Sequence, residues 1–190
     1  IDLIIEKFLS IGIDQIFLTL NYKKNIIKSY LKDQYKKKKF QYINEKKRLG
    51  TASSLQFIPG RTKKNLIVSN CDTILKINFQ ELIKYHEDEK NNLTLVAAIK
   101  DFKIPYGICV STKYNLLKKI KEKPTLKILA NTGTYIINNN LLKFIPRKDH
   151  YDMNIFIENL MKKKFKIGIY PIEDKDWIDT GDWKNFYNSK

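Results

Sequence analysis

The stretch "LIVSNCDT", residues 66–73, runs from three apolar residues into a polar end that contains an aspartate. A short apolar run of this kind is typical of a strand buried on both faces of a parallel sheet, and it predicts a strand over residues 65–70. Asp72 follows that strand directly, at the position where open α/β sheets bind their ligands. It is therefore a candidate metal ligand, although Asn and Asp also open ordinary turns after strands.

The segments around this strand alternate between helical and strand periodicity. Asn78 is a suitable N-cap residue for one of the helices. Alternation of this kind predicts parallel strands joined by crossover helices. The predicted helices cover residues 2–11, 23–35, 50–58 and 78–89, and the predicted strands cover residues 15–21 and 40–44.

The second half of the chain changes to several strands in succession with one further helix. Taken with the first half, this order predicts an α/β fold with a Rossmann-like, doubly wound, mostly parallel sheet and helices on both faces. The strands are predicted at residues 93–100, 107–112, 116–123, 133–138 and 166–172, and the helix at residues 155–164.

Composition favours one globular domain spanning residues 1–190. The apolar content of 43% excludes a disordered chain, and no apolar run approaches the length of a membrane span. The two cysteines, Cys71 and Cys109, show neither metal-ligand spacing nor a disulfide framework. We therefore expect a cytoplasmic protein that has no membrane partner.

The net charge of +16 raises the question of nucleic-acid binding. Only Arg48, Arg61 and Arg147 are arginines, so lysine supplies nearly all of the positive charge. Abundant Lys, Ile and Asn fit the codon usage of AT-rich DNA, and no Arg-rich face interleaved with aromatic residues is present. We expect no nucleic-acid partner.

Two further motifs combine polar residues with turn signals. In "EKKRLGTASSL", residues 45–55, Gly50 permits close backbone approach, and Thr51 adds a hydroxyl beside a helix N-terminus. In "KEKP", residues 121–124, a carboxylate that can accept sugar hydroxyls precedes a lysine that can hold phosphate. Taken alone, the first motif is better explained as an ordinary helix start, and the second as a surface Glu-Lys pair before a turn.

The last two motifs are "NTGTYIIN", residues 131–138, and "DWIDTGDWKNFY", residues 176–187. Asp179 ends a short predicted strand and precedes a Thr-Gly turn, so it too can be a turn residue. The chain as a whole presents Leu-Gly-Thr-Ala, Val-x-Asn-x-Asp, Tyr-Gly, Glu-Lys-Pro, Asn-x-Gly-x-Tyr and Trp-x-Asp-x-Gly in that order. In this order and over essentially all 190 residues, it resembles the sugar-phosphate nucleotidyltransferases, also called nucleotide-sugar pyrophosphorylases.

This resemblance implies the fold of the nucleotide-diphospho-sugar transferases, a nucleotide site and a metal site. Gly50 and Thr51 match the segment that contacts the nucleotide, together with Asp72. Asp72 and Asp179 match the two aspartates that bind Mg²⁺, a hard cation that prefers oxygen ligands. We expect these two side chains to lie close together in space.

The resemblance also implies a sugar-phosphate site. Lys123 would offset the charge of the attacking phosphate, which makes it the third catalytic residue beside the two aspartates, and we expect it in the same cleft, beside Asn131. The residues that match the sugar-phosphate site are Tyr106, Gly107, Glu122, Lys123, Asn131 and Gly133.

The implied reaction joins a nucleoside triphosphate to a sugar 1-phosphate. A phosphate oxygen of the sugar 1-phosphate attacks the α-phosphorus of the triphosphate, and pyrophosphate leaves. Because two anions must approach each other, the site needs a divalent metal ion and cationic side chains. The sequence does not name the sugar, the nucleotide or the oligomeric state.

The chain departs from the family pattern in two places. Cys71 stands where the family has Gly before the metal aspartate, and its small side chain fits that position. The family's first strand and its Gly-x-Gly-Thr-Arg loop have no counterpart here, so we expect an N-terminally truncated domain. The absent strand is expected between residues 15–21 and 65–70, and the fragment alone is expected to be inactive. The alternative is a catalytically incomplete binding or regulatory module for sugar phosphates or nucleotide sugars.

Overall fold

The computed structural model describes residues 1–45, 49–58, 65–147 and 150–181. Arg48, Arg61 and the end of the motif at residues 176–187 lie outside these ranges. The helices are α1 (Asp2–Ser10), α2 (Lys24–Gln34), α3 (Phe79–Asp88) and α4 (Met153–Lys162), with 3₁₀ helices η1 (Ser53–Phe57), η2 (Asn139–Phe144) and η3 (Asp174–Asp176). The strands are β1 (Ile16–Leu20), β2 (Phe40–Asn44), β3 (Asn65–Ser69), β4 (Thr73–Leu75), β5 (Leu93–Lys103), β6 (Ile108–Ser111), β7 (Leu117–Lys121), β8 (Thr125–Asn138), β9 (Ile167–Glu173) and β10 (Trp177–Asp179).

The central sheet has four strands in the order β3-β8-β5-β9. β8 runs antiparallel to both of its neighbours, whereas β5 and β9 are parallel. Three of the four strands therefore point the same way and only β8 is reversed, which confirms the predicted α/β fold with a mostly parallel sheet.

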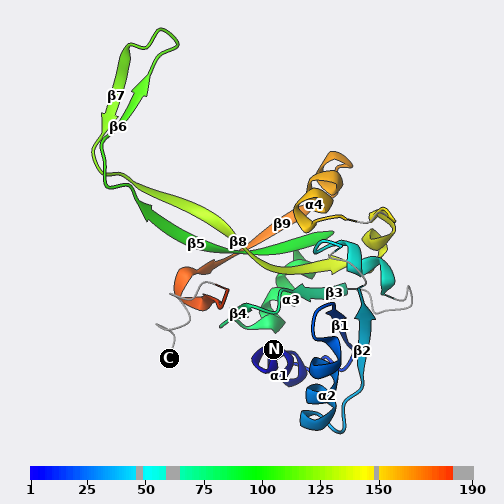
Figure 1. Ribbon diagram of the computed structural model, residues 1–190. Helices are drawn as coiled ribbons and strands as arrows, with labels where there is room; N and C mark the ends of the chain where they lie inside the picture. Colours follow the sequence, from blue (N-terminus) through cyan, green and yellow to red (C-terminus); the bar gives the residue numbers. More distant parts are fainter. Residues whose placement is uncertain (46–48, 59–64, 148–149, 182–190) are drawn as a thin grey trace.

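Helices cover both faces of this sheet (Figure 1). On one face, Tyr135 and Ile137 of β8 belong to the same core as Phe156 of α4. On the other face, Ile136 belongs to the core that contains Leu82 of α3. Because successive residues of a strand point to opposite faces, burial on both faces explains why the run at residues 135–137 is continuously apolar.

The opening stretch forms β3 and also contributes to both cores. Ile67 packs against the core on the α3 face and Val68 against the core on the α4 face. All five residues of β3 are only half-buried, because in the described part of the chain β3 pairs with β8 on one edge alone.

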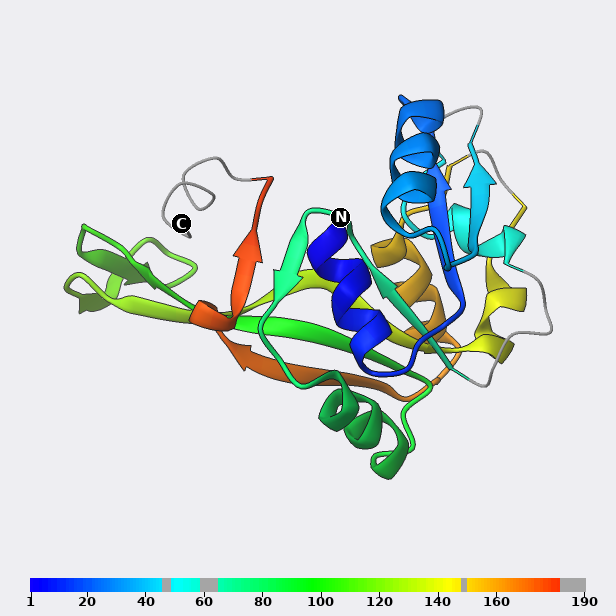
Figure 2. The same ribbon diagram turned by 90° about the horizontal axis from the view of Figure 1, so that it is seen from below.

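A second, two-stranded parallel sheet is formed by β1 and β2 and lies beside α2 (Figure 2). Within the described ranges, β1 pairs only with β2, so β1 and β3 each have a free edge. The expectation that a further strand lies between them stays a prediction.

The structure corrects three sequence predictions. The helix expected at residues 50–58 is only the short 3₁₀ helix η1, and the strand β4 was not predicted. β8 begins at Thr125 instead of residue 133, and its first half is mostly exposed. This half contains apolar residues, but Leu126, Ile128 and Leu129 are exposed and do not alternate regularly with polar residues, so the period-two pattern of a half-buried strand is absent.

The first half of β8 and the second half of β5 extend away from the rest of the protein, which we call the body, as a two-stranded ribbon. This ribbon continues into the hairpin β6–β7 (Figure 1). We call residues 99–131, the outer ribbon and the hairpin together, the arm. None of the described helices is long and apolar enough to cross a membrane.

Asn78 caps α3, as the sequence predicts. Its Oδ1 accepts hydrogen bonds from the backbone N–H groups of Gln80 (3.0 Å) and Glu81 (3.5 Å). Its Nδ2 donates to Glu81 Oε1 at 3.0 Å. These bonds satisfy backbone donors that have no partner inside the helix.

We predict that Asn78→Ala lowers the free energy of unfolding by about 1 kcal/mol, because the freed N–H groups lose their acceptor. Urea denaturation of the variant and of the unmodified protein measures the loss. Asn78→Ser, which keeps an acceptor oxygen, is the matched control and should lose less. Equal losses for Ala and Ser would show that the cap does not stabilise α3.

Candidate active site

Asp72 and Asp179 come together where β4 pairs with β10. The two strands are antiparallel, with Asp179 opposite Thr73. The Thr180 backbone N–H and its hydroxyl both donate to the Asp72 carbonyl, at 2.8 and 3.0 Å. A β-carbon on Gly181 would lie 3.1 Å from Asp179 Oδ1 and 3.4 Å from Asp72 Oδ2, so these oxygens are at most about 6.5 Å apart.

The loop that carries Asp72 is fixed to β8. The Asn70 N–H donates to the Gly133 carbonyl (3.1 Å), and the buried Thr73 hydroxyl donates to the Thr132 carbonyl (2.8 Å). The Thr132 hydroxyl in turn donates to the Val96 carbonyl of β5 at 2.9 Å. The loop of Asp72 is therefore bonded directly to β8 and, through Thr132, to β5.

Asn131 and Gly133 lie in the same region. Gly133 has a φ of +78°, and a β-carbon there would collide with the Asn70 side chain. The Gly133 N–H donates to Asn131 Oδ1 (3.0 Å), and Asn131 Nδ2 donates to the Tyr135 hydroxyl (2.8 Å). Burial raises the pKa of Tyr135, and the Asn131 bond opposes this rise. The Asn131 amide is thus oriented by the protein, and one further N–H is left to donate.

Gly50 and Thr51 pack against the segment that leads into α4. The Tyr151 N–H donates to the Leu49 carbonyl (2.7 Å), and the Thr51 hydroxyl accepts from the Met153 N–H (3.0 Å). A β-carbon on Gly50, whose φ is +85°, would lie 2.8 Å from the Tyr151 carbonyl. The structure thus gives Gly50 a role in the packing of two segments and gives Thr51 a role at the N-terminus of α4.

Asp152 is a polar residue of this site that the motifs did not single out. It is the N-cap residue of α4 but makes no capping bond. Its Oδ1 would lie 2.7 Å from a β-carbon on Gly50 and is 3.9 Å from His150 Nε2. In the sequence, the only feature that pointed to Asp152 is its position between Tyr151 and the predicted helix.

Tyr106, Gly107, Glu122 and Lys123 gather where the hairpin joins the ribbon. A β-carbon on Gly107 would lie 2.8 Å from Glu122 Oε2. Tyr106 is 74% exposed, and Lys123 has a φ of +41°. The four residues therefore form one group, which lies on the arm.

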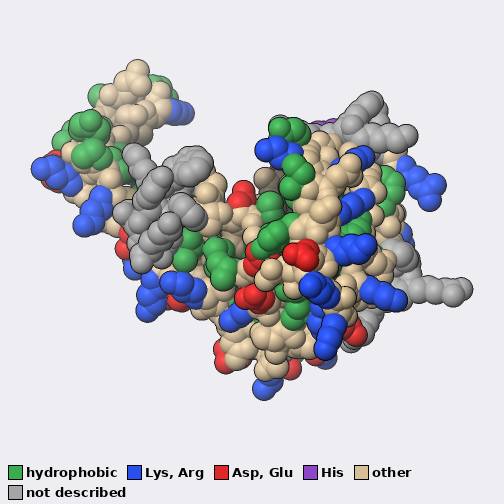
Figure 3. All heavy atoms as spheres, turned by 60° about the horizontal axis from the view of Figure 1, so that its bottom comes forward, with side chains coloured by type: hydrophobic (Ala, Val, Ile, Leu, Met, Phe, Trp, Pro, Cys, Tyr) green, Lys and Arg blue, Asp and Glu red, His purple; other side chains and the backbone are tan. Residues whose placement is uncertain are grey.

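This group does not lie beside Asn131. From Thr125 to Asn131, β8 advances six residues as extended strand, which is about 20 Å at roughly 3.3 Å per residue. The expectation that Lys123 lies beside Asn131 is therefore wrong for this conformation, because the arm points away from the body. Figure 3 shows lysine or arginine side chains both on the arm and on the rest of the molecule.

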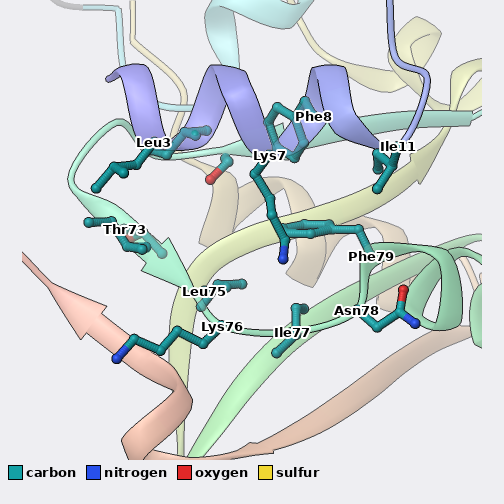
Figure 4. Close-up of a pocket in the computed structure, with 13 residues that line it drawn as sticks. Leu3, Lys7, Phe8, Ile11, Thr73, Leu75, Lys76, Ile77, Asn78 and Phe79 are labelled. Atoms are coloured by element: carbon teal, nitrogen blue, oxygen red, sulfur yellow. The ribbon is translucent and has the colours of Figure 1, made fainter.

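A cavity of about 550 Å³ lies between α1 and the segment from β3 to α3 (Figure 4). Leu3, Phe8 and Ile11 of α1 lie on one side of it, and Leu75 and Phe79 lie on the other. This lining is mostly apolar, so it suits a hydrophobic segment better than a nucleotide.

The aspartate pair supplies the donor type that a magnesium site needs, two carboxylates beside Gly181. Within the described ranges, no group of three or more His, Cys, Asp or Glu side chains could hold a metal ion. Two carboxylates suffice for Mg²⁺, because this ion is usually bound by one or two carboxylates, waters and the phosphates of the substrate.

Comparison with known proteins identifies the family of this chain. A family model described as nucleotidyl transferase matches residues 1–190. The chain is 29% identical over 196 residues to a mannose-1-phosphate guanyltransferase of Debaryomyces hansenii, covering 96% of this chain and 52% of the relative. It is 27% identical over 190 residues to the D-glycero-α-D-manno-heptose 1-phosphate guanylyltransferase of Campylobacter jejuni, covering 99% of this chain and 83% of the relative.

Solved structures show the same fold. The crystal structure of HddC from Yersinia pseudotuberculosis superposes with a TM-score of 0.70 at 24% identity, over 98% of this chain and 82% of that one. The chain spans about half the length of several curated relatives that it matches, namely 48%, 40% and 52%.

We predict that Gly50→Ala destabilises the protein more than Gly12→Ala does. Gly12 has nearly the same φ, +83°, but no atom within 4 Å of its absent β-carbon, so this control isolates the backbone strain. Clash with the Tyr151 carbonyl and Asp152 should add about 1–3 kcal/mol at position 50. Thermal or urea unfolding of both variants gives the difference, and equal losses would contradict the close packing.

Proposed function

The chain belongs to the nucleotidyl transferase family, and from that premise we propose that it transfers a nucleoside monophosphate from a nucleoside triphosphate to a sugar 1-phosphate. The products are a nucleoside diphosphate sugar and pyrophosphate. The observation that carries the proposal is the meeting of Asp72 and Asp179 at the β4–β10 pair.

In this reaction an oxygen of the sugar 1-phosphate forms a bond to the α-phosphorus. The bond from that phosphorus to the oxygen bridging to the β-phosphate breaks, and the electron pair leaves with pyrophosphate. Bound at Asp72 and Asp179, Mg²⁺ would offset the negative charge of the phosphates. Lys123 would do the same for the attacking phosphate, and Asn131 would donate its free N–H to the sugar.

We further propose a guanine nucleotide and a manno-configured sugar 1-phosphate as the substrates. The support is that relatives covering nearly all of this chain are named as guanylyltransferases of mannose 1-phosphate and of a manno-heptose 1-phosphate. The proposed setting is the cytoplasm, where nucleoside triphosphates and Mg²⁺ are present.

A coupled pyrophosphate-release screen of the complete protein, with the upstream segment included, tests this proposal. It combines each of the four ribonucleoside triphosphates with glucose, mannose and manno-heptose 1-phosphates in the presence of MgCl₂. GTP with a manno-configured sugar phosphate should give the highest rate. Binding of these ligands without any pyrophosphate release would instead favour a binding or regulatory module.

The aspartate pair provides the most direct test of the mechanism. We predict that, in the complete protein, Asp72→Asn and Asp179→Asn each lower kcat by at least about 100-fold, because metal binding at the reacting phosphates weakens. The far-ultraviolet circular dichroism spectrum should not change. Asp176→Asn, three positions from Asp179, is the matched control and should keep most of the rate. A metal-dependent rate that survives in both Asp72 and Asp179 variants would refute the metal site.

We also propose that these residues are part of a longer domain whose further strand lies between β1 and β3. The support is that each of these strands has a free edge within the described ranges. The mostly apolar cavity between α1 and the segment from β3 to α3 adds to it, because a cavity of about 550 Å³ leaves room for further apolar side chains beside Phe8 and Phe79.

We predict that a longer version of the protein with an added upstream strand melts at a higher temperature than residues 1–190 alone. Each buried backbone N–H or C=O that gains a partner should contribute on the order of 1–3 kcal/mol. Differential scanning fluorimetry compares the two forms, and solubility and turnover should rise with the melting temperature. If residues 1–190 melt cooperatively at an ordinary temperature and turn over substrate, the additional strand is not needed.

A further inference from the structure

Exposed hydrophobic side chains are concentrated on the arm. Among the described residues nineteen large hydrophobic side chains are exposed, and ten of them belong to the arm, although the arm is a small part of the chain. Large exposed apolar patches mark protein–protein or membrane interaction sites, so the arm is a candidate interaction surface. The ten residues are Phe102, Tyr106, Val110, Tyr114, Leu116, Leu117, Ile120, Leu126, Ile128 and Leu129.

The turn of the hairpin holds its apolar side chains out in an ordered conformation. The Thr112 N–H donates to the Leu116 carbonyl at 2.8 Å, and the Thr112 hydroxyl oxygen accepts from the N–H groups of Tyr114 and Leu116 at 3.3 Å each. Tyr114, Leu116 and Leu117 are nevertheless 72%, 66% and 60% exposed. We call residues 111–119 the tip, which is the part of the arm farthest from the body (Figure 1).

Apolar side chains lie on both faces of the hairpin. Val110 pairs with Lys119, and Cys109 pairs with Ile120. Because successive residues of a strand point to opposite faces, the exposed side chains of Val110 and Ile120 lie on opposite faces. A protein that packs on one face of a two-stranded ribbon leaves the other face in water. A lipid membrane surrounds an inserted tip on all sides, so it covers both faces.

Lysines surround these apolar side chains. Residues 108–121 contain four lysines and neither aspartate nor glutamate. The Lys113 Nζ lies 5.0 Å from the centre of the Tyr114 ring. A lysine stem can lie along apolar surface while its ammonium group stays in water, and anionic lipid head groups attract basic segments. The composition of the hairpin is therefore complementary to an anionic membrane surface.

Charge also disfavours a second copy of this chain as the partner of the tip. The net charge of +16 opposes self-association. Since residues 108–121 contain no carboxylate side chain, two hairpins that met would bring lysines together without acidic partners. An anionic surface removes this repulsion instead of adding to it.

The backbone of the hairpin limits the depth of insertion. In the described part of the chain β6 and β7 pair only with each other, so their outer edges carry N–H and C=O groups without strand partners. Such groups are costly in hydrocarbon, which confines the tip to the hydrated interfacial layer. Segments that lie in this layer enter it by about 5–10 Å, which is about two or three residues of strand at roughly 3.3 Å per residue.

We propose that the tip is an anchor that binds the anionic surface of a lipid membrane. Its three exposed apolar side chains enter the interfacial layer, and its lysines contact the lipid head groups. The expectation of no membrane partner came from the absence of an apolar span, and an anchor that lies on a membrane surface needs no span. The anchor does not depend on the proposed reaction, because the tip contains none of the candidate site residues.

Co-sedimentation of the complete protein with lipid vesicles tests the anchor. Vesicles of phosphatidylglycerol and phosphatidylcholine in equal parts should bind the protein at least about 10-fold more strongly than vesicles of phosphatidylcholine alone. High salt should weaken this binding. If the complete protein does not bind the anionic vesicles, the anchor is refuted.

Substitutions in the tip separate the anchor from a general attraction between a basic protein and anionic lipid. Tyr114→Ser/Leu116→Ser/Leu117→Ser should weaken binding to the anionic vesicles about 10-fold, because the tip loses the apolar area that it buries in the membrane. The melting temperature and the rate of pyrophosphate release should not change, since all three side chains are exposed.

The matched control for this variant is Tyr22→Ser/Ile26→Ser/Met161→Ser. These side chains of the body are 76%, 65% and 59% exposed, close to the values at the tip. The control variant should bind the anionic vesicles as the unmodified protein does. Equal binding by both variants would refute the anchor and leave only electrostatic attraction of the whole protein.

The lysines of the tip are tested at constant net charge. Lys118→Ala/Lys119→Ala should weaken binding to the anionic vesicles more than Lys36→Ala/Lys37→Ala, which removes the same charge from exposed positions on the body. Equal losses for the two pairs would show that the tip does not face the membrane.

An environment-sensitive fluorophore reports whether the tip enters the lipid. In a Cys71→Ser/Cys109→Ser background, acrylodan is attached to Leu116→Cys or, as the control, to Ile26→Cys. Anionic vesicles should shift the emission of the label on the tip to shorter wavelength and leave the control label unchanged. Equal emission from both labels would contradict insertion of the tip.

Light scattering without vesicles tests the other occupant of this surface, a second copy of the chain. The unmodified protein and the triple serine variant of the tip should have the same mass. A dimer of the unmodified protein that the tip variant abolishes would overturn the membrane anchor, because the tip would then be a surface for self-association.

Discussion

The antiparallel pairing of β4 with β10 is the interaction on which the candidate site depends. Each strand has only three residues, yet their register sets Asp179 beside the loop that carries Asp72. Thr180 strengthens the junction by donating twice to the Asp72 carbonyl. The two carboxylates are more than a hundred positions apart in the sequence. This contact brings them close enough to be candidates for binding one ion.

The reversed strand β8 links this junction to the rest of the molecule. Its register against β5 shifts between Leu95 and Ala97, next to Gly133. The irregular residues there bond the loop of Asp72 on one side and β5 on the other. The same strand then leaves the body to form the arm, so one element supports the metal site and carries the remote sugar-phosphate residues.

Several residues that suggest ligand binding are also used by the fold itself. Gly50 makes room for Tyr151 and Asp152, Thr51 bonds the first turn of α4, and the Asn131 amide bonds Tyr135. These contacts do not oppose a functional role, because a side chain fixed by the protein loses little freedom when a substrate arrives. They do mean that substitutions at these positions alter stability as well as binding.

The sequence by itself determined the α/β class, most of the helices and strands, the cap of α3 and the family, because periodicity and ordered motifs are local or follow the order of the chain. The tertiary structure alone decided that β8 is reversed, that β4 meets β10 and that Lys123 is far from Asn131. Pairing partners and bend angles depend on contacts between distant segments, and the exposed apolar residues of the ribbon, such as Phe102 and Leu126, do not indicate its length or direction.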